Sequence, residues 1–352
     1  MGRVTITDVA RTAGVSMKSV SRVVNSEANV SARLRARVNA AIDSLGYVPH
    51  QAARSLAGGR ALTIGLLFDN PSPHYTLKIQ VGAYQACREH HYHLSIEHLN
   101  LGAGNEAHQV EDILRNVRVD GFVVTPPLTD SEIVLDALEA RGIPYVRIAP
   151  VSFPRRSPAF AIDDDKAARV VAEHLWSLGH RRFGLVNGPS NHGAAARRRQ
   201  GFLAALSDHG CTSIAETNAG FDFERGISAA LELVSLPQPA TAIFAANDDS
   251  AAGVMSGLAQ CGLRVPEHVS VVGFDDSWIA RAVWPYLTTI HQPIAEMAYA
   301  ATQHLIRSYN VKPAPRDAIL LPFELIMRST TAVPEKRRQK NRSGSRKRES
   351  TR

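Results

Sequence analysis

Between residues 61 and 331, short apolar runs of strand length alternate with amphipathic stretches of helical length. The apolar runs are LTIGLLF, HLSIEHL, GFVVTP, PYVRIA, RFGLVNG, TAIFAAN and VSVVGFD. In the amphipathic stretch ARVVAEHLWSLG, Val171, Leu175 and Leu178 share one helical face. Because this alternation is typical of parallel sheets covered by helices on both faces, we predict an α/β fold. Seven or more strands over about 270 residues favour two linked lobes over a single sheet.

The first 60 residues follow a different pattern, that of three short helices. Thr5 and Asp8 form a capping-box pair ahead of VARTAG, and Gly14 ends this helix. Ser16 can cap a second helix, MKSVSRVVN, and Ser31 can cap a third, ARLRARVNAAIDSL. A helix, a turn that contains glycine and a second helix are the signature of a helix-turn-helix.

The second of these helices carries side chains suited to reading DNA bases. At about 100° per residue, Met17, Lys18, Ser21 and Arg22 fall on one arc of the helix. Lys18 and Arg22 can donate to guanine O6 and N7 in the major groove, where Met17 can make an apolar contact. Candidate donors to the phosphate backbone are Thr5, Ser16, Ser19, Ser21, Asn25 and Ser31. From spacing alone, a generic three-helix bundle with a cationic face is the alternative.

The distribution of charge agrees with a DNA-binding head. The net charge is +7, but residues 1–60 carry +6 and residues 332–352 carry +7, so the body between them is acidic. We therefore expect the two basic ends of the chain, rather than its acidic body, to bind a polyanion. The tail EKRRQKNRSGSRKRESTR is of low complexity, and we expect it to be disordered. A solvated surface of mixed charge explains the tail equally well.

Residues 50–59, HQAARSLAGG, predict a helix of about two turns that is too short to be stable alone. The helix exposes Leu56 with little apolar sequence beside it, and two glycines end it. Such a weak helix between two well-defined parts of the chain requires an explanation, which the family resemblance below supplies.

Polar residues end several of the apolar runs in the body. Asp69 and Asn70 follow the first run, Asn247 and Asp248 a later one, and Asp275 the last. Open α/β sheets bind ligands outside the carboxyl ends of their strands, and carboxylates and amides suit the hydroxyl groups of polyols. Strand-end caps and turn initiation are the alternative roles for these residues.

Several function classes are disfavoured by what the sequence lacks. It has no apolar run of transmembrane length and no apolar signal segment at its start, and its three cysteines are far apart. We therefore expect a cytoplasmic protein with reduced thiols. Phosphate-loop, dinucleotide-binding, zinc-protease and nucleophile-elbow motifs are absent, and the histidines of REHHYH lack an adjacent cysteine or carboxylate triad. We accordingly expect no enzyme, no cofactor and no metal.

The head closely resembles the headpiece of the lactose-repressor (LacI/GalR) family of bacterial transcription factors. The residues that carry the resemblance are VTITDVARTAGVSMKSVSRVVN, VSARLRARVNAAIDSLGYVP and ARSLAG, and the match extends to about residue 328. The resemblance implies a headpiece at 1–49, a hinge helix and linker at 50–60, a ligand-binding and dimerisation core at 61–331, and a basic tail at 332–352. The core is expected to resemble periplasmic sugar-binding proteins. Its N-lobe would comprise about 61–163 with part of 291–328, and its C-lobe about 164–290.

The resemblance also assigns positions in the core. Besides Asp69 at the first strand end, it implies ligand contacts from Ser72, Tyr75, Arg198, Phe221, Asn247, Asp275 and Gln292. One departure concerns the segment IPYVRIAP, where Ala149 stands in place of an aspartate that the family often carries. Arg147 in this segment is a candidate for the cleft, which would favour an acidic sugar, and an ion pair elsewhere is the alternative.

In this family, paired hinge helices enter the DNA minor groove. Leu56 would wedge between base pairs, Ala53 would allow close approach and Arg54 would reach phosphate. We therefore expect a homodimeric repressor that reads a palindromic operator and answers to a small effector, a sugar or sugar derivative. The alternative is a sugar-binding or sugar-processing protein with an appended DNA-binding module, which a turnover assay would distinguish. A periplasmic transport receptor is disfavoured by the missing signal peptide.

Overall fold

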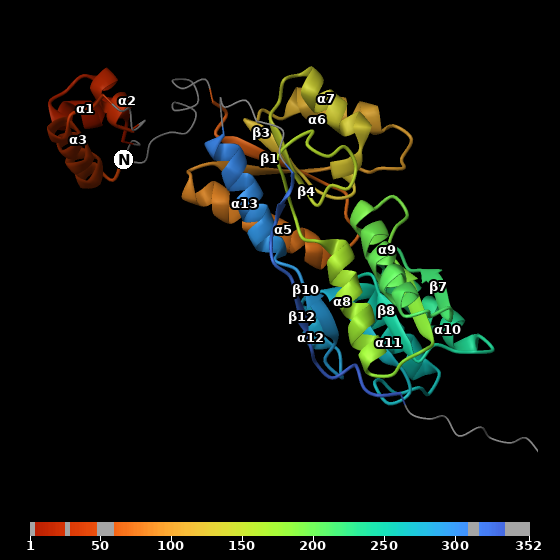
Figure 1. The fold of residues 1–352 in the computed structure, drawn as a ribbon. Coiled ribbons are helices and arrows are strands. Elements are labelled where there is room, and N and C mark those ends of the chain that lie inside the picture. The colour runs from red at the N-terminus through yellow and green to blue at the C-terminus, as the bar shows by residue number, and fades with distance from the viewer. Residues whose placement is uncertain (1–3, 25–28, 48–59, 309–316, 335–352) are drawn as a thin grey trace, which may run out of the picture.

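The computed structural model describes residues 4–24, 29–47, 60–308 and 317–334. They form a small helical headpiece and two α/β lobes (Figure 1). The predicted fold class is confirmed. Within the described ranges, no helix is long and apolar enough to cross a membrane.

The headpiece contains α1 (Ile6–Ala13), α2 (Met17–Val24) and α3 (Ala32–Leu45). The predicted caps are present: the Thr5–Asp8 capping box begins α1, and Ser31 accepts a hydrogen bond from the backbone N–H of Leu34 at the start of α3. Glycines with positive φ end α1 and α3. Valines from all three helices are buried together, as expected for a helix-turn-helix with a single small core.

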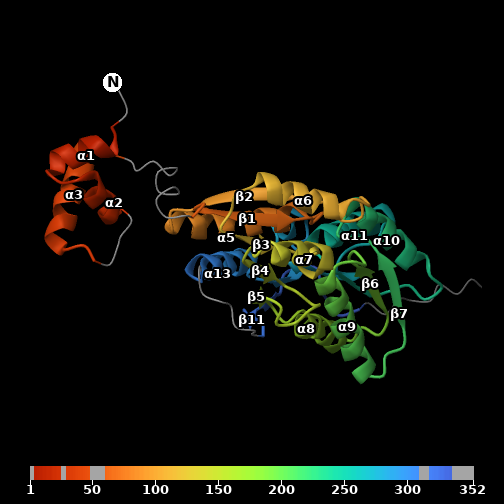
Figure 2. The ribbon, with the colours of Figure 1, turned by 90° about the horizontal axis from the view of Figure 1, so that it is seen from above.

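The N-lobe sheet is parallel throughout and has the order β11-β5-β4-β3-β1-β2 (Figure 2). Its strands are β1 (Thr63–Phe68), β2 (His93–His98), β3 (Gly121–Val124), β4 (Tyr145–Ile148), β5 (Ala159–Ala161) and β11 (Ile319–Leu320). Its helices are α5 (Pro73–Glu89), α6 (Glu106–Asn116), α7 (Glu132–Ala140) and α13 (Ile294–Arg307), with a short 3-10 helix η1 (Leu128–Asp130). Side chains of α5 and α13 share one core with the sheet, and those of α6 and α7 share another. The central strands β1, β3 and β4 are therefore buried on both faces, which explains their largely hydrophobic runs, whereas β2 at the sheet edge has exposed polar residues.

The C-lobe repeats this plan, with the order β12-β10-β9-β8-β6-β7 and only β12 antiparallel. Its strands are β6 (Phe183–Asn187), β7 (Ile214–Asn218), β8 (Ala242–Ala245), β9 (Ser270–Asp275), β10 (Thr288–His291) and β12 (Glu324–Ile326). Its helices are α8 (Asp164–Ser177), α9 (Gly193–Asp208), α10 (Phe223–Ser235), α11 (Asp248–Gln260) and α12 (Ile279–Ala282). Helices α8 and α9 cover one face, and α10 and α11 the other.

The chain passes between the lobes three times. It crosses from β5 to α8, returns from β10 to α13, and crosses again between β11 and β12. The second crossing returns α13 to the N-lobe, where it packs along α5 (Figure 1). Neither lobe is therefore a continuous stretch of sequence, and the ends of the two sheets meet at the crossings.

Candidate functional site

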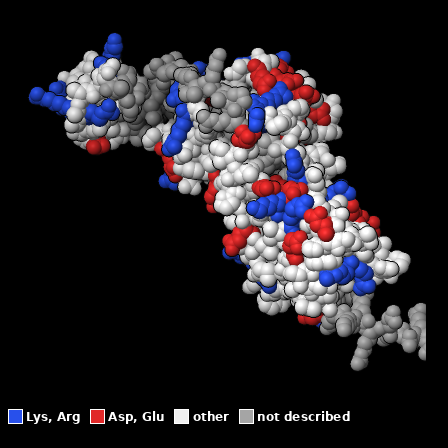
Figure 3. Space-filling model, in the orientation of Figure 1, with Lys and Arg blue, Asp and Glu red and all other residues white. Residues whose placement is uncertain are grey.

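The exposed side of α2 presents two of the three predicted base-reading residues. Met17 is 53% exposed, Lys18 is also exposed, and Lys and Arg side chains project from the headpiece in Figure 3. Arg22 is half-buried, and its Nη2 donates to the backbone carbonyl of Asn29 at 2.9 Å. This bond holds Arg22 beside the start of α3, and because a guanidinium has several N–H groups, contact with a base does not require the bond to open.

The predicted phosphate contacts surround α2, and several of them also stabilise helix ends. The Ser16 hydroxyl accepts from the N–H of Ser19 at 3.1 Å, which caps α2, and Ser31 caps α3 in the same way. The Thr5 hydroxyl donates to Asp8 at 2.7 Å. Backbone N–H groups at helix starts can also bind phosphate. The remaining predicted DNA contacts lie outside the described residues: Asn25, Ala53, Arg54 and Leu56.

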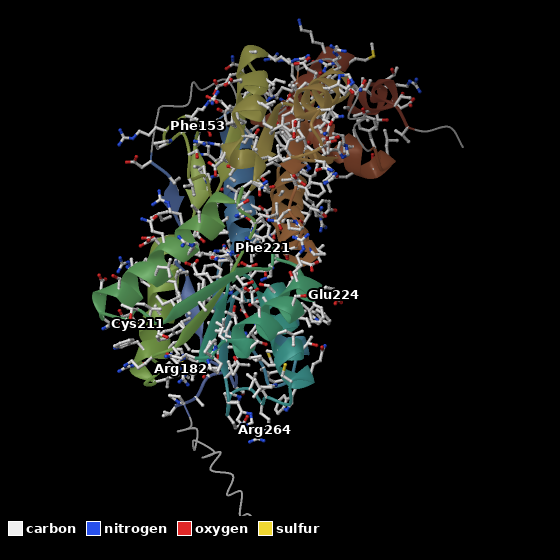
Figure 4. All side chains as sticks on the ribbon, turned by 90° about the vertical axis from the view of Figure 1, so that its right-hand side faces the viewer. Phe153, Arg182, Cys211, Phe221, Glu224 and Arg264 are labelled. Carbon is white, nitrogen blue, oxygen red and sulfur yellow. The ribbon has the colours of Figure 1, made fainter. Side chains whose placement is uncertain are left out.

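A pocket lies between the two lobes at the carboxyl ends of their strands. It is lined by Asn70, Ser72 and Tyr75 from the N-lobe and by His192, Arg198, Phe221 and Asp275 from the C-lobe. Figure 4 shows Phe221 at the junction of the lobes. The cavity volume is about 10 Å³, roughly the room for one water molecule. The lobes therefore lie close together around the pocket in this structure.

Arg198 lies at the centre of the pocket wall and is held from three sides. Its Nε donates to Asp164 at 2.8 Å and its Nη1 donates to the carbonyl of Ala246 at 2.7 Å. The guanidinium lies 3.6 Å from the centre of the Phe274 ring, and its Nη1 lies 3.6 Å from Asp275 Oδ1. Because α8, β8 and β9 together fix the guanidinium, its orientation toward a ligand is set in advance.

Asp275 provides the carboxylate of the pocket. It ends β9 with a φ of 111°, a strained conformation that places the side chain at the sheet edge. Burial raises the pKa of Asp275 to about 6, and the nearby Arg198 and the Gln292 amide hold it below the value that burial alone would give. Gln292 donates to Asp275 Oδ1 and lies behind it, outside the pocket lining.

The N-terminus of α11 forms a polar layer beneath the pocket. Asn247 caps α11, accepting from the N–H of Ser250 at 3.0 Å, and its amide donates to the carbonyl of Phe221 at 3.3 Å. The Ser72 hydroxyl of the N-lobe donates to Asp249 of the C-lobe at 2.6 Å. The alternative role predicted for Asn247 is turn initiation, whereas the structure shows it as a helix cap whose amide also supports the Phe221 backbone.

Asp248 follows Asn247 and is completely enclosed. Its Oδ1 accepts from the Thr289 hydroxyl and its Oδ2 from the Ser277 N–H, both at 2.6 Å. Burial, with the charge of Asp275, raises the pKa of Asp248 to about 8. Asp248 is therefore mostly protonated at neutral pH, whereas Asp275 is mostly ionised.

Two candidate ligand residues need correction. Arg147 is fully buried in the N-lobe, where it donates to Ser157 Oγ and to backbone carbonyls including those of Ser152 and Phe153 at 2.9 and 2.6 Å. It supports the loop after β4, and it neither lines the pocket nor forms an ion pair with another described residue. Asp69 accepts from the N–H of Leu101 at 2.8 Å and fixes the loop after β2.

Three residues near the pocket were not predicted as ligand contacts. Asn70 lines the pocket, although the sequence analysis placed it only at a strand end. Asp249 receives the Ser72 bond between the lobes. His192 packs against Phe221 with ring centres 5.0 Å apart and planes at 81°. Its place shortly before Arg198, to which the family resemblance assigns a ligand contact, is the sequence signal that could have identified it.

Among the described residues, no three His, Cys, Asp or Glu side chains form a cluster suited to a metal ion. The His180 imidazole lies away from the pocket, bonded to Thr241 and Ser270 at 3.0 Å, and burial lowers its pKa to about 4. The pocket chemistry is therefore that of recognition by hydrogen bonds, charge and one aromatic ring.

Known proteins resemble the chain along nearly its whole length. Family models match residues 5–50 ("Bacterial regulatory proteins, lacI family") and residues 172–331 ("Periplasmic binding protein-like domain"). The lactose operon repressor of Escherichia coli (strain K12) is 31% identical over 337 residues, covering 95% of this chain and 92% of that protein. A crystal structure of the lac repressor dimer bound to operator and the anti-inducer ONPF is 29% identical, with a TM-score of 0.76 over 94% of this chain and 100% of that one. A complex of the transcriptional regulator CelR with cellobiose is 28% identical, with a TM-score of 0.70 over 93% of this chain and 100% of that one.

Proposed function

The chain belongs to the LacI family of bacterial regulatory proteins, and we propose that it is a homodimeric repressor released from or held on its operator by a carbohydrate bound between the lobes. It is a DNA-binding transcription regulator rather than an enzyme. The observation that carries the proposal for the ligand is the pairing of Arg198 and Asp275 beside Phe221, a guanidinium, a carboxylate and an aromatic face around one small cavity.

These three groups match the chemistry of a sugar. The carboxylate accepts hydrogen bonds from hydroxyl groups, the guanidinium donates to hydroxyl or ring oxygens, and the aromatic ring packs against C–H groups. The relatives support the same class, because one solved neighbour contains cellobiose. Asn247 and Gln292 orient the pocket from behind, and Ser72 and Tyr75 contribute from the N-lobe.

The ligand acts through contacts that cross between the lobes. Ser72 bonds Asp249, and the Lys78 ammonium of α5 donates to the backbone carbonyls of Asp275 and Asp276 at 3.3 and 2.8 Å. A ligand between the lobes would change these contacts and with them the relative orientation of the lobes. The change in lobe orientation then passes through the N-lobe to the hinge at residues 50–60.

Two headpieces of the dimer would read the two half-sites of a palindromic operator, because the symmetry of the protein imposes the same symmetry on its site. Met17, Lys18 and Arg22 read bases, while Thr5, Ser16, Ser19, Ser21, Asn25 and Ser31 contact phosphates. Ala53, Arg54 and Leu56 of the hinge enter the minor groove. A regulator of chromosomal operators works in the cytoplasm, which is the localisation we infer.

The test is a thermal-shift screen of the full-length protein with ribose, galactose, cellobiose and their sugar acids, followed by operator binding with each compound that shifts the melting temperature. At 100 times its dissociation constant, a ligand adds about 2.7 kcal/mol of stability. Loss of operator binding identifies an inducer, and a gain identifies a corepressor. If none of the compounds stabilises the protein, the carbohydrate class is wrong.

A further inference from the structure

His192 is a pocket residue whose two ring nitrogens have different surroundings. It precedes α9, is 4% exposed and lines the pocket between the lobes. Its Nδ1 accepts a hydrogen bond from the backbone N–H of Ala195 at 3.4 Å and so caps α9. Its Nε2 is buried and has no hydrogen-bond partner among the residues that the structure describes. A buried polar atom without a partner in the wall of a ligand pocket requires an explanation.

The bond at Nδ1 decides which nitrogen carries the proton. Burial, with the positive charge of Arg198, lowers the pKa of His192 to about 3, so the imidazole is neutral at physiological pH. A neutral imidazole has one N–H, and the nitrogen that accepts the Ala195 N–H cannot hold it. The proton is therefore on Nε2, which makes this atom a hydrogen-bond donor.

The ring of His192 is also fixed in direction. It meets the Phe221 ring edge to face, and Phe221 occupies a positive φ of 67°. Gly188 leaves room for this arrangement, because a Cβ atom there would collide with the Phe221 ring. The imidazole cannot turn away without losing both the cap of α9 and the contact with Phe221.

We propose that His192 is a specificity-determining residue, whose Nε2–H donates a hydrogen bond to an oxygen of the carbohydrate that lies against Phe221. This inference rests on the proposed function of the pocket. The donor selects a hydroxyl, ether or carbonyl oxygen at that position. It disfavours a deoxy sugar, which leaves the donor unpaired, and an amino sugar, whose ammonium group has no lone pair to offer.

A matched pair of variants separates this role from that of a helix cap. His192→Asn keeps a short side chain that can accept the Ala195 N–H, since asparagine is a good N-cap, but it has no donor at the position of Nε2. His192→Gln keeps a donor nitrogen at a similar distance from the backbone and is a weaker cap. If His192 reads the ligand, the Asn variant binds sugar at least tenfold more weakly with an unchanged melting temperature, and the Gln variant retains more affinity. If His192 is only a cap, the Gln variant binds sugar more weakly than the Asn variant.

The experiment measures binding of ribose, galactose, glucose and cellobiose to the full-length protein and both variants by calorimetry, then repeats it with the monodeoxy and amino analogues of the sugar that binds. We expect one deoxy position to lose about tenfold or more in the wild type and to lose nothing further in His192→Asn, because the two changes remove the same bond. Equal losses in both proteins would overturn the inference and leave the sugar site intact. If none of the four sugars binds the wild type, the carbohydrate proposal fails and this inference fails with it.

Discussion

Asp248→Asn is expected to stabilise the C-lobe at alkaline pH. The replacement is nearly isosteric: the amide oxygen can accept from the Ser277 N–H, and the amide nitrogen can donate to the Thr289 hydroxyl. A Cβ atom at Gly273 would collide with the Asp248 carboxylate, so the site is tightly enclosed and offers no water to an ionised side chain. The variant removes the titration while keeping the hydrogen bonds.

The magnitude follows from the raised pKa. The folded protein holds the Asp248 proton up to a pH of about 8, whereas the unfolded chain releases it near 3.8, the ordinary pKa of an aspartate side chain. Between these values the folded state binds more protons than the unfolded state, so the free energy of unfolding falls as pH rises. From pH 6 to pH 8, Asp248 alone lowers the free energy of unfolding by about 2 kcal/mol. Asp275, with a pKa of about 6, contributes mainly below this window.

The assay is urea unfolding of wild type and variant at pH 6 and pH 8, followed by tryptophan fluorescence. All three tryptophans, Trp176, Trp278 and Trp284, lie between residues 164 and 290, so the signal reports the C-lobe. Both proteins contain the same histidines, so any contribution of histidine titration cancels when the free energies of unfolding of variant and wild type are subtracted. The stability of the variant relative to wild type should rise by about 2 kcal/mol between the two pH values. If the free energy of unfolding changed equally in both proteins between pH 6 and pH 8, the idea that Asp248 is protonated would be refuted.

Three further substitutions test the assigned roles. Asp275→Ala should abolish the response to sugar in an operator-release assay with operator affinity unchanged, and a normal response would remove Asp275 from the pocket. Arg22→Ala should cost roughly 1–3 kcal/mol at the specific operator and less on random DNA, and equal losses on both would make Arg22 a phosphate contact. Arg147→Met leaves several buried carbonyl groups unpaired and should destabilise the protein by about 3 kcal/mol, measured by urea unfolding, without changing sugar affinity. A selective loss of sugar affinity would return Arg147 to the ligand site.

Helices and strands that are determined by residues close together in the sequence could be predicted well. The helix caps of the headpiece depend on residues three positions apart, and the central strands are apolar on both faces. Some of the strands that the pattern misses differ from the central strands in burial or polarity. In β7 several residues face solvent at the sheet edge, and in β10 the buried Thr288 and Thr289 are polar, held by hydrogen bonds to distant residues. The hydrophobic periodicity of a sequence does not indicate an edge strand that faces solvent, nor a strand whose buried residues are polar.

In the pocket, too, some residues could be predicted from the sequence and others could not. Arg198 and Asp275 follow from a family motif and from the rule that ligands bind at strand ends. The direction in which Arg147 points depends on carbonyl groups of a loop that packs back on it, and no motif records such contacts. The proton position on His192 depends on a backbone N–H three residues away and on burial by both lobes. Such properties arise only when the tertiary structure is complete.

The triple crossing between the lobes also has a consequence for biosynthesis. Helix α13, which packs along α5, is translated only after the entire C-lobe up to β10. Thr330 is fully buried in the C-lobe, accepting from the Thr288 N–H at 2.8 Å and donating to the carbonyl of Val271 at 2.7 Å. Neither lobe can therefore finish folding before almost the whole core has left the ribosome, unlike proteins whose domains fold one after another during translation. The apolar face of α5 stays open on the nascent chain throughout that time, so chaperones have a longer period in which to bind this regulator than they would for a tandem-domain protein of the same length.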